Sequence, residues 1–160
     1  MKILYLLRHG KAEAGDEDFE RELSPQGERD VERMGRHLYE RRVRPNIVYC
    51  STAPRARRTA EILLPIMDVE LNSVRFEEFL YLASPDRLQE FVAGFAEDYE
   101  SALICGHNPG LEHLATLYLN RVAGSFPTSA FREILFNADS WATVDIDTVM
   151  QTTLITPKDL

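Results

Sequence analysis

The chain begins with a short apolar run that ends abruptly in a cation and an imidazole. Ile3 to Leu7 is apolar at every position, and Arg8-His9-Gly10 follows directly. Such a run is typical of a β-strand buried on both faces of a parallel sheet. Ligands bind these sheets in the crevice beyond the carboxyl ends of the strands, so we expect Arg8 and His9 to lie there. Taken alone, the tripeptide suits a structural role as well as a chemical one.

The rest of the chain alternates the patterns of strands and helices. Ser24-Pro25 and Ser84-Pro85 each combine an N-cap hydroxyl with a proline at the first helical position, which marks the start of a helix. We expect strands at residues 3–7, 47–50, 69–71, 102–105, 131–136, 141–146 and 152–155, and helices from 25 to before 44, from 54 to about 64, from 85, and from 110 to about 119. This alternation predicts an α/β fold, a three-layer α/β/α sandwich whose mostly parallel sheet has an antiparallel edge strand.

Length and charge narrow the class of protein. The 160 residues fit one domain, residues 1–160, which is large enough for an apolar core. A formal net charge of −8 disfavours binding to nucleic acid or to an anionic membrane. The sequence has no run that could cross a bilayer and no secretory signal pattern, so we expect a cytoplasmic protein. Cys50 and Cys105 end predicted buried strands, where a thiol packs as a small apolar side chain, and we expect no disulfide.

Charged and imidazole side chains recur where three of the predicted strands end. Arg8 and His9 follow the first strand, Arg55 follows the second, and His107 follows the fourth. Because the carboxyl ends of parallel strands lie side by side, these four side chains can meet. Two guanidiniums and two imidazoles around one point form a pocket for a tetrahedral dianion, since the forked donors of arginine match phosphate oxygens. The sequence therefore predicts a phosphoryl-binding pocket.

A metal site is the main competitor for a pair of histidines. No Asp or Glu in these three segments completes a ligand set, and the arginines would repel a cation, so we expect no metal and no other cofactor. The nucleophile is then a side chain, and Ser51 and Cys50 are better explained by turn and core roles. A neutral imidazole nitrogen can attack phosphorus and form a phosphohistidine. This chemistry favours His9, which stands beside Arg8 at a glycine turn.

Three segments carry a resemblance to a known family. Residues 7–10, 51–60 and 106–110 are similar to the three signatures of the histidine phosphatase superfamily; they read Leu-Arg-His-Gly, Ser-Thr-Ala-Pro-Arg-Ala-Arg-Arg-Thr-Ala and Gly-His-Asn-Pro-Gly. Each segment alone is a weak signal, but all three in order at compatible spacing are a strong one. The chain most resembles the SixA-like phosphohistidine phosphatase branch. It shares with that branch the Arg-His-Gly-Lys-Ala motif near the start, the Gly-His-Asn-Pro motif and a short length without a lid insertion.

The resemblance implies a phosphoglycerate mutase-like fold and a role for each motif residue. His9 would be the residue that becomes phosphorylated, while Arg8, Arg55 and His107 would hold the phosphoryl oxygens, with His107 protonated when phosphate binds. The backbone N–H of Asn108 could add a donor at the start of a helix. Ser129 lies in a Thr-Ser-Ala segment, residues 128–130, which would line the pocket.

The sequence leaves two candidates for the proton donor to the leaving group. Larger members of the family use a carboxylic acid from the segment after the second helix, and the candidates here are Glu77 and Glu78. The imidazole of a phosphohistidine is a good leaving group when protonated, so it needs little help from an acid. Near the motifs, Arg57 and Arg58 are expected on the solvated side of their helix, and Lys11 and Glu13 in a solvated loop at the rim.

Three functions are consistent with this pocket. The first is a metal-independent phosphatase that acts on phosphohistidine in a partner protein through a covalent phosphohistidine intermediate. The second is a small-metabolite phosphatase or a phosphoglycerate mutase-like enzyme, which would need a lid and a well-placed general acid. The third is an inactive phosphate-binding module. Such a module would lack one or more of the four central residues, but Arg8, His9, Arg55 and His107 are all present. The pattern favours the first, and opposed protonation of the two histidines predicts a bell-shaped pH dependence of activity.

Overall fold

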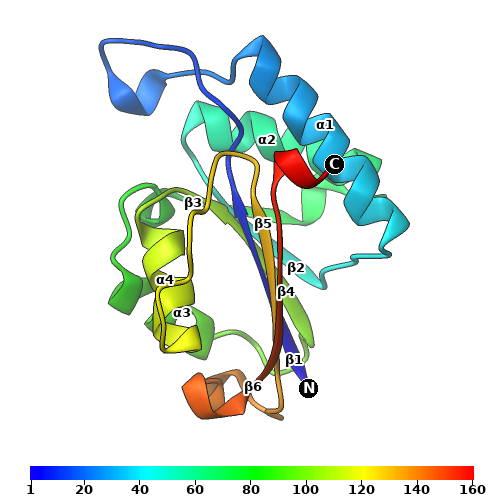
Figure 1. Cartoon of the computed structure of the whole chain (residues 1–160), viewed down its shortest axis with the longest axis vertical. Helices are drawn as coiled ribbons and strands as arrows, with labels where there is room; N and C mark the ends of the chain where they lie inside the picture. Colours follow the sequence, from blue (N-terminus) through cyan, green and yellow to red (C-terminus); the bar gives the residue numbers. More distant parts are fainter.

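The computed structural model describes residues 1–160 and contains one six-stranded sheet between two layers of helices (Figure 1). The strands are β1 Lys2–Arg8, β2 Ile47–Ser51, β3 Val74–Glu77, β4 Ser101–Gly106, β5 Phe131–Phe136 and β6 Val149–Ile155. The helices are α1 Pro25–Glu40, α2 Pro54–Ile66, α3 Pro85–Ala93 and α4 Gly110–Leu119. The strand order is β3-β2-β4-β1-β5-β6, and β1, β2, β3 and β4 pair in parallel. Strand β5 pairs antiparallel with both β1 and β6, so the predicted α/β/α sandwich with a mostly parallel sheet is confirmed.

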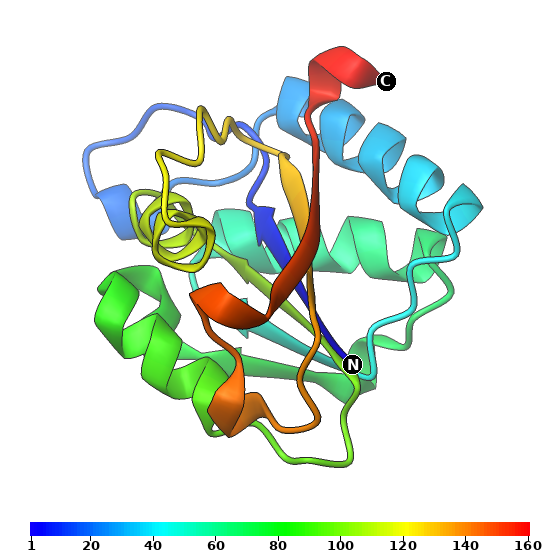
Figure 2. The same ribbon diagram turned by 60° about the horizontal axis from the view of Figure 1, so that its bottom comes forward.

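Strand β1 shows how the sheet separates the apolar core into two halves. Leu4 and Leu6 face a core that includes residues of α3 and α4, whereas Tyr5 and Leu7 face a core that includes residues of α1 and α2. Neighbouring residues of a strand point to opposite faces, so a continuously apolar strand requires helices on both sides. Figure 2 shows the sheet between the two pairs of helices. No helix in the structure is both long and apolar enough to cross a membrane.

The register of the central strands brings their carboxyl ends to one level. Arg8 of β1 pairs with Gly106 of β4, and Cys50 of β2 pairs with Cys105 of β4. The residues that directly follow these three strands therefore begin at the same edge of the sheet. Helices α1 and α3 start as expected, with the hydroxyls of Ser24 and Ser84 accepting backbone N–H groups of their first turns.

Two of the predicted strands are wrong. Residues 69–71 form no strand, because Leu71–Ser73 is a 3-10 turn and the edge strand β3 starts only at Val74. Residues 141–146 form no strand either. Trp141–Thr143 is a 3-10 turn capped by the side chain of Ser140, and a second 3-10 turn follows at Ile146–Thr148. Trp141 and Val144 are buried in the second of these regions, whereas in the first Val69 is partly buried and Leu71 is exposed. A short apolar pattern does not distinguish such turns from a strand.

Candidate active site

Four of the predicted side chains come together at the carboxyl edge of the sheet. His9 follows β1, His107 follows β4, and Arg55 lies in the first turn of α2; their exposed fractions are 6%, 7% and 5%. The imidazole centroids of His9 and His107 lie 4.9 Å apart. Together with Arg8, these residues line a pocket of about 350 Å³, whose other lining residues are Lys11, Ala12, Asp18, Arg21, Asn108 and Thr128.

The surroundings of His9 decide which of its ring nitrogens is free. Nδ1 lies 2.7 Å from the carbonyl oxygen of Gly10, and because a carbonyl only accepts hydrogen bonds, Nδ1 carries the proton. The other nitrogen, Nε2, keeps its lone pair and lies 3.4 Å from the Nε–H of Arg55. The backbone is also held, since the N–H of His9 donates to Gly106 and its carbonyl accepts from Ser129. His9 is thus a fixed neutral imidazole whose Nε2 accepts only one long hydrogen bond, from Arg55, and an electrophile can take its place.

The turn after His9 is attached to helix α2. The N–H of Gly10 donates to the hydroxyl of Thr59 at 3.0 Å, and this hydroxyl donates to the carbonyl oxygen of Arg55 at 2.7 Å. Thr59 and Arg55 lie one helical turn apart. The position of the imidazole is therefore coupled to the helix that carries the guanidinium.

His107 is oriented by Ser51 at the end of β2. Its Nε2 lies 2.8 Å from the Ser51 hydroxyl oxygen, which also accepts the N–H of Ala53. The second ring nitrogen, Nδ1, is buried and has no partner in the structure. Since Nε2 is engaged, Nδ1 is the ring nitrogen left to meet an anion in the pocket.

Both imidazoles are neutral in the ligand-free pocket. Burial lowers the pKa of His9 to about 4, and the charges of Arg55 and Arg8 act in the same direction. Burial also lowers the pKa of His107 to about 3, assisted by His9 and Arg55. The protonated His107 that the family resemblance implied is therefore not the ligand-free state. A bound dianion would favour the charged form of His107, so anion binding is linked to proton uptake.

Arg8 and Asn108 meet at a single carbonyl group. A terminal nitrogen of Arg8 donates to the Phe126 carbonyl oxygen at 3.1 Å, and the Asn108 side-chain amide donates to the same oxygen at 2.9 Å. The Nε–H of Arg8 is buried without a partner. Asn108 lies two residues before α4 and lines the pocket. This shared carbonyl fixes the Arg8 guanidinium and leaves it donors for an anion.

The segment that follows Phe126 also reaches the site. Thr128 lines the basic pocket, whereas Ser129 is fully buried beside it, with a hydroxyl that has no partner. Ser129 adopts φ of 63° and donates its N–H to the carbonyl of His9. In the ligand-free structure, Ser129 therefore acts on the site through the backbone of His9.

Two residues that contact the site, Asp18 and Tyr81, were not predicted from the sequence. Asp18, in the 3-10 turn Asp18–Glu20 after β1, accepts from Arg55 on both its backbone carbonyl, at 2.7 Å, and its carboxylate, at 3.2 Å. The Tyr81 hydroxyl donates to the same carboxylate oxygen. The Tyr81 ring packs edge-on against His107 and against Phe19, with centroid distances of 5.2 Å and 5.0 Å. Phe19 was the available signal, because a single aromatic residue in an otherwise polar loop indicates a local packing contact.

The two proposed proton donors lie outside the basic pocket. Glu77 ends β3 in register with Ser51, and Glu78 is exposed in the following 3-10 turn, Glu78–Tyr81. Neither lines the pocket, where Asp18 is the single carboxylate.

The remaining charged residues near the motifs lie largely as expected. Arg57 and Arg58 are exposed; Arg57 lies over the Phe76 ring and Arg58 pairs with Glu28 at 3.0 Å. Exposed Lys11 reaches the rim of the pocket. Glu13 does not line this pocket but a separate acidic hollow further along the same loop.

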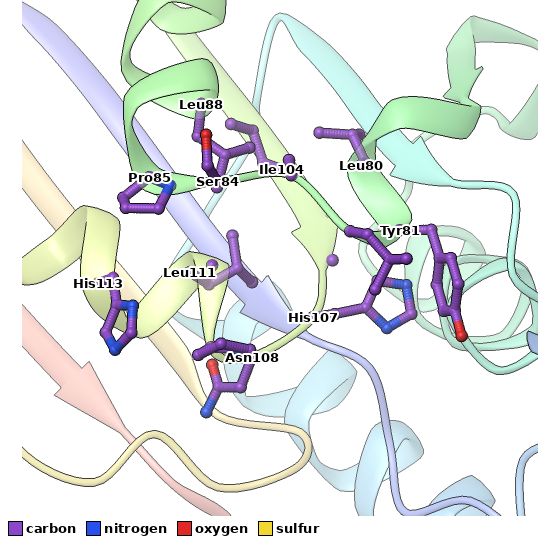
Figure 3. Close-up of a pocket in the computed structure, with 15 residues that line it drawn as sticks. Leu80, Tyr81, Ser84, Pro85, Leu88, Ile104, His107, Asn108, Leu111 and His113 are labelled. Atoms are coloured by element: carbon purple, nitrogen blue, oxygen red, sulfur yellow. The ribbon is translucent and has the colours of Figure 1, made fainter. Parts of the chain in front are cut away.

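A second, more apolar pocket of about 290 Å³ lies against the first (Figure 3). His107 and Asn108 line both pockets. Leu80, Leu88, Ile104 and Leu111 form much of its wall, and the start of α3 borders it at Ser84 and Pro85. A ligand seated against His107 therefore has apolar protein surface within reach.

Comparisons with known proteins point to one family. Residues 4–80 match the model of the histidine phosphatase superfamily (branch 1). An uncharacterized protein of Mycobacterium tuberculosis is 30% identical over 151 residues, which cover 87% of this chain and 92% of the relative.

Solved structures agree with this result. A protein from Agrobacterium tumefaciens assigned as phosphohistidine phosphatase SixA is 26% identical with a TM-score of 0.76, over 83% of this chain and 90% of that one. The protein histidine phosphatase SixA complexed with tungstate matches over 98% of both chains with a TM-score of 0.82 and 20% identity, which confirms the expected fold.

Proposed function

The chain belongs to the histidine phosphatase superfamily, and from this premise we propose that it removes phosphoryl groups from phosphohistidine in a partner protein. The reaction proceeds through a phosphoryl group bonded to His9 and needs no metal. One observation carries the proposal: the single unprotonated ring nitrogen of His9 lies in a pocket lined by Arg8, Arg55 and His107.

The first step is an in-line displacement at phosphorus. Nε2 of His9 attacks with its lone pair, a P–N bond forms, and the bond between phosphorus and the leaving group breaks with its electron pair on the leaving atom. Negative charge on the phosphoryl oxygens meets the guanidiniums of Arg8 and Arg55 and the free Nδ1 of His107, which binds best when protonated. In the second step, water attacks phosphorus, its proton passes to solvent, and inorganic phosphate leaves with the lone pair restored to His9.

The pocket favours leaving groups that need no acid from the protein. A phosphohistidine whose second ring nitrogen is protonated leaves as neutral imidazole, so no proton has to be delivered when the P–N bond breaks. The single carboxylate of the pocket, Asp18, has a pKa of about 2, lowered by hydrogen bonds from Tyr81 and Arg21, and it stays ionised. An alkyl phosphate, whose leaving alkoxide requires a proton, is correspondingly a poor substrate.

The electrostatics of the pocket support independence from metal. Three guanidiniums, of Arg8, Arg21 and Arg55, and Lys11 already supply positive charge where a metal ion would otherwise neutralise the phosphoryl oxygens. We therefore expect full turnover in the presence of a chelator.

A substrate panel with chelator present throughout tests the proposal. The purified chain is assayed with a phosphohistidine-containing protein, a phosphotyrosine peptide, sugar phosphates and 3-phosphoglycerate. We expect the phosphohistidine protein to be turned over with the highest kcat/KM. Substantial mutase turnover or a clear preference for a sugar phosphate would instead favour a small-metabolite enzyme.

A second measurement examines the covalent intermediate. Rapid quenching without acid, followed by mass spectrometry, is expected to find phosphate on His9. His9→Ala should abolish turnover, whereas His113→Ala, which changes an exposed imidazole outside the basic pocket, should keep it. Full turnover by His9→Ala would refute the proposal.

A further inference from the structure

We propose that Asp18 is a positioning and specificity-determining residue, which sets the orientation of Arg55 and selects phosphoryl compounds with a neutral or cationic group next to phosphorus over those with an anionic one. This inference rests on the proposed function, because it concerns the pocket that holds the transferred phosphoryl group. Its evidence is a set of contacts that join two loops distant in the sequence.

Arg55 retains N–H donors beyond those that the protein engages. A guanidinium has five N–H groups. Three are engaged in the ligand-free structure: Nε–H with His9 Nε2, one terminal N–H with the Asp18 carbonyl, and one on the other terminal nitrogen with the Asp18 carboxylate. Two N–H groups remain without a protein partner, one on each terminal nitrogen. Asp18 thus holds the planar guanidinium in one orientation without using up its capacity for phosphate.

Asp18 also connects Arg55 with His107. Its carboxylate oxygen Oδ2 accepts both from Arg55 and from the Tyr81 hydroxyl, and its Oδ1 accepts from Arg21 at 3.1 Å. The Tyr81 ring lies edge-on against His107 and 5.7 Å from the Arg55 guanidinium. Two of the side chains that face the phosphoryl group therefore depend on one carboxylate for part of their surroundings.

Asp18 also changes the charge at the mouth of the pocket. Asp18 places a fixed negative charge at the mouth of a pocket whose other ionised side chains are cations. Next to the phosphoryl group, a second anionic group on the ligand is repelled by this carboxylate, while a cationic one is attracted. A protonated imidazole bonded to phosphorus fits this arrangement, and a carboxylate close to phosphorus, as in a phosphorylated hydroxy acid, does not.

Three small phosphonates of similar size test the selection without requiring turnover. Aminomethylphosphonate has a cation next to its phosphonate group, methylphosphonate is neutral there, and phosphonoacetate has a carboxylate there. Their dissociation constants are measured by calorimetry at low salt and about pH 9, where all three phosphonate groups are largely dianions and the amine stays protonated. The proteins compared are the unmodified chain, Asp18→Asn and Asp16→Asn. Asp16 is the matched control, because it lies exposed in the same loop and outside the basic pocket.

We expect the unmodified protein to bind aminomethylphosphonate about tenfold or more tightly than phosphonoacetate. Asp18→Asn should reduce this ratio to near one, while Asp16→Asn should keep it. Asp18→Asn should also lower kcat for phosphohistidine more than it raises KM, because the orientation of Arg55 matters most as charge builds in the transition state.

Two results would overturn the inference. One is a wild-type protein with no preference among the three phosphonates, and the other is an Asp18→Asn variant that keeps the preference or weakens all three equally. Tyr81→Phe gives an independent check, since loss of its hydroxyl should reduce the ratio in the same direction. These readouts are equilibrium affinities, so they remain decisive even if the chain fails to hydrolyse phosphohistidine, which would refute the proposed function alone.

Discussion

Acidification should destabilise this protein strongly through the two buried histidines. The pKa of His107 falls from its ordinary value of 6.5 to about 3 in the folded protein, mainly by burial, and that of His9 falls to about 4. Between the folded and the ordinary values, the unfolded chain binds protons that the folded chain does not, so stability rises with pH in this window. The contribution is complete above about pH 6.5 and is lost as the pH falls toward the folded values.

The size of the effect follows from the width of that window. About pH 4.5 lies two pH units below the ordinary pKa of histidine. At this pH, each buried histidine lowers the free energy of unfolding by about 2.5 kcal/mol compared with about pH 7. Carboxylates titrate over the same range, so a variant is needed to isolate one imidazole. His107→Asn removes the titrating group while keeping a polar side chain near Ser51.

The assay is urea unfolding at about pH 7 and at about pH 4.5, followed by the fluorescence of Trp141, which is fully buried. Between the two pH values, the free energy of unfolding of His107→Asn should fall by about 2.5 kcal/mol less than that of the unmodified protein. His113→Asn changes an exposed imidazole, and its free energy of unfolding should fall as much as that of the unmodified protein. Equal losses in all three proteins, with unchanged m-values, would refute the assignment of His107 as a buried neutral imidazole.

Three further predictions concern the scaffold of the pocket. Gly27→Ala should destabilise the protein by about 2 kcal/mol, because a Cβ atom there would lie 2.2 Å from the Lys11 carbonyl oxygen, whereas Gly94→Ala, with a nearest contact of 3.6 Å, should keep its melting temperature. An unchanged melting temperature in Gly27→Ala would contradict this. Ser51→Ala should weaken inorganic phosphate binding about tenfold, since His107 loses the hydroxyl that orients it, and calorimetry that finds equal affinity would show that the ring is held by other contacts. At about pH 8.5, where free phosphate is the dianion, phosphate binding should take up a proton on His107, which is seen as a dependence of binding enthalpy on the ionisation heat of the buffer; identical enthalpies in two buffers would exclude it.

The sequence was most informative where charged or imidazole residues follow the apolar pattern of a buried strand. His9, Arg55 and His107 each follow an apolar run that can be recognised without any contact information, and the parallel arrangement of those runs places the side chains together. The layers of the fold were predictable for the same reason, because β1 and β4 are apolar at nearly every position and helices such as α1 have a clear N-cap.

The residues that were not predicted lie in turns. Asp18 and Tyr81 belong to two 3-10 turns that meet only through tertiary packing, and their contact with Arg55 leaves no periodic pattern in the sequence. The strand expected at residues 69–71 was misplaced because Val69 and Leu71 resemble the alternation that actually occurs at Val74 and Phe76. The candidate proton donors, Glu77 and Glu78, were named only from their position in the segment after the second helix.

The shared level of the strand ends has a practical consequence for protein engineering. Every contact that orients His9, Arg55 and His107 lies at the carboxyl edge of the sheet, whereas the turn at Arg41 and Arg42 that leads from α1 into β2 lies at the opposite edge. A fluorescent label or an inserted affinity tag at that turn would stand a full strand length away from the phosphoryl group. By contrast, deleting one residue within β1 would swap the faces of its side chains and carry His9 out of line with its partners.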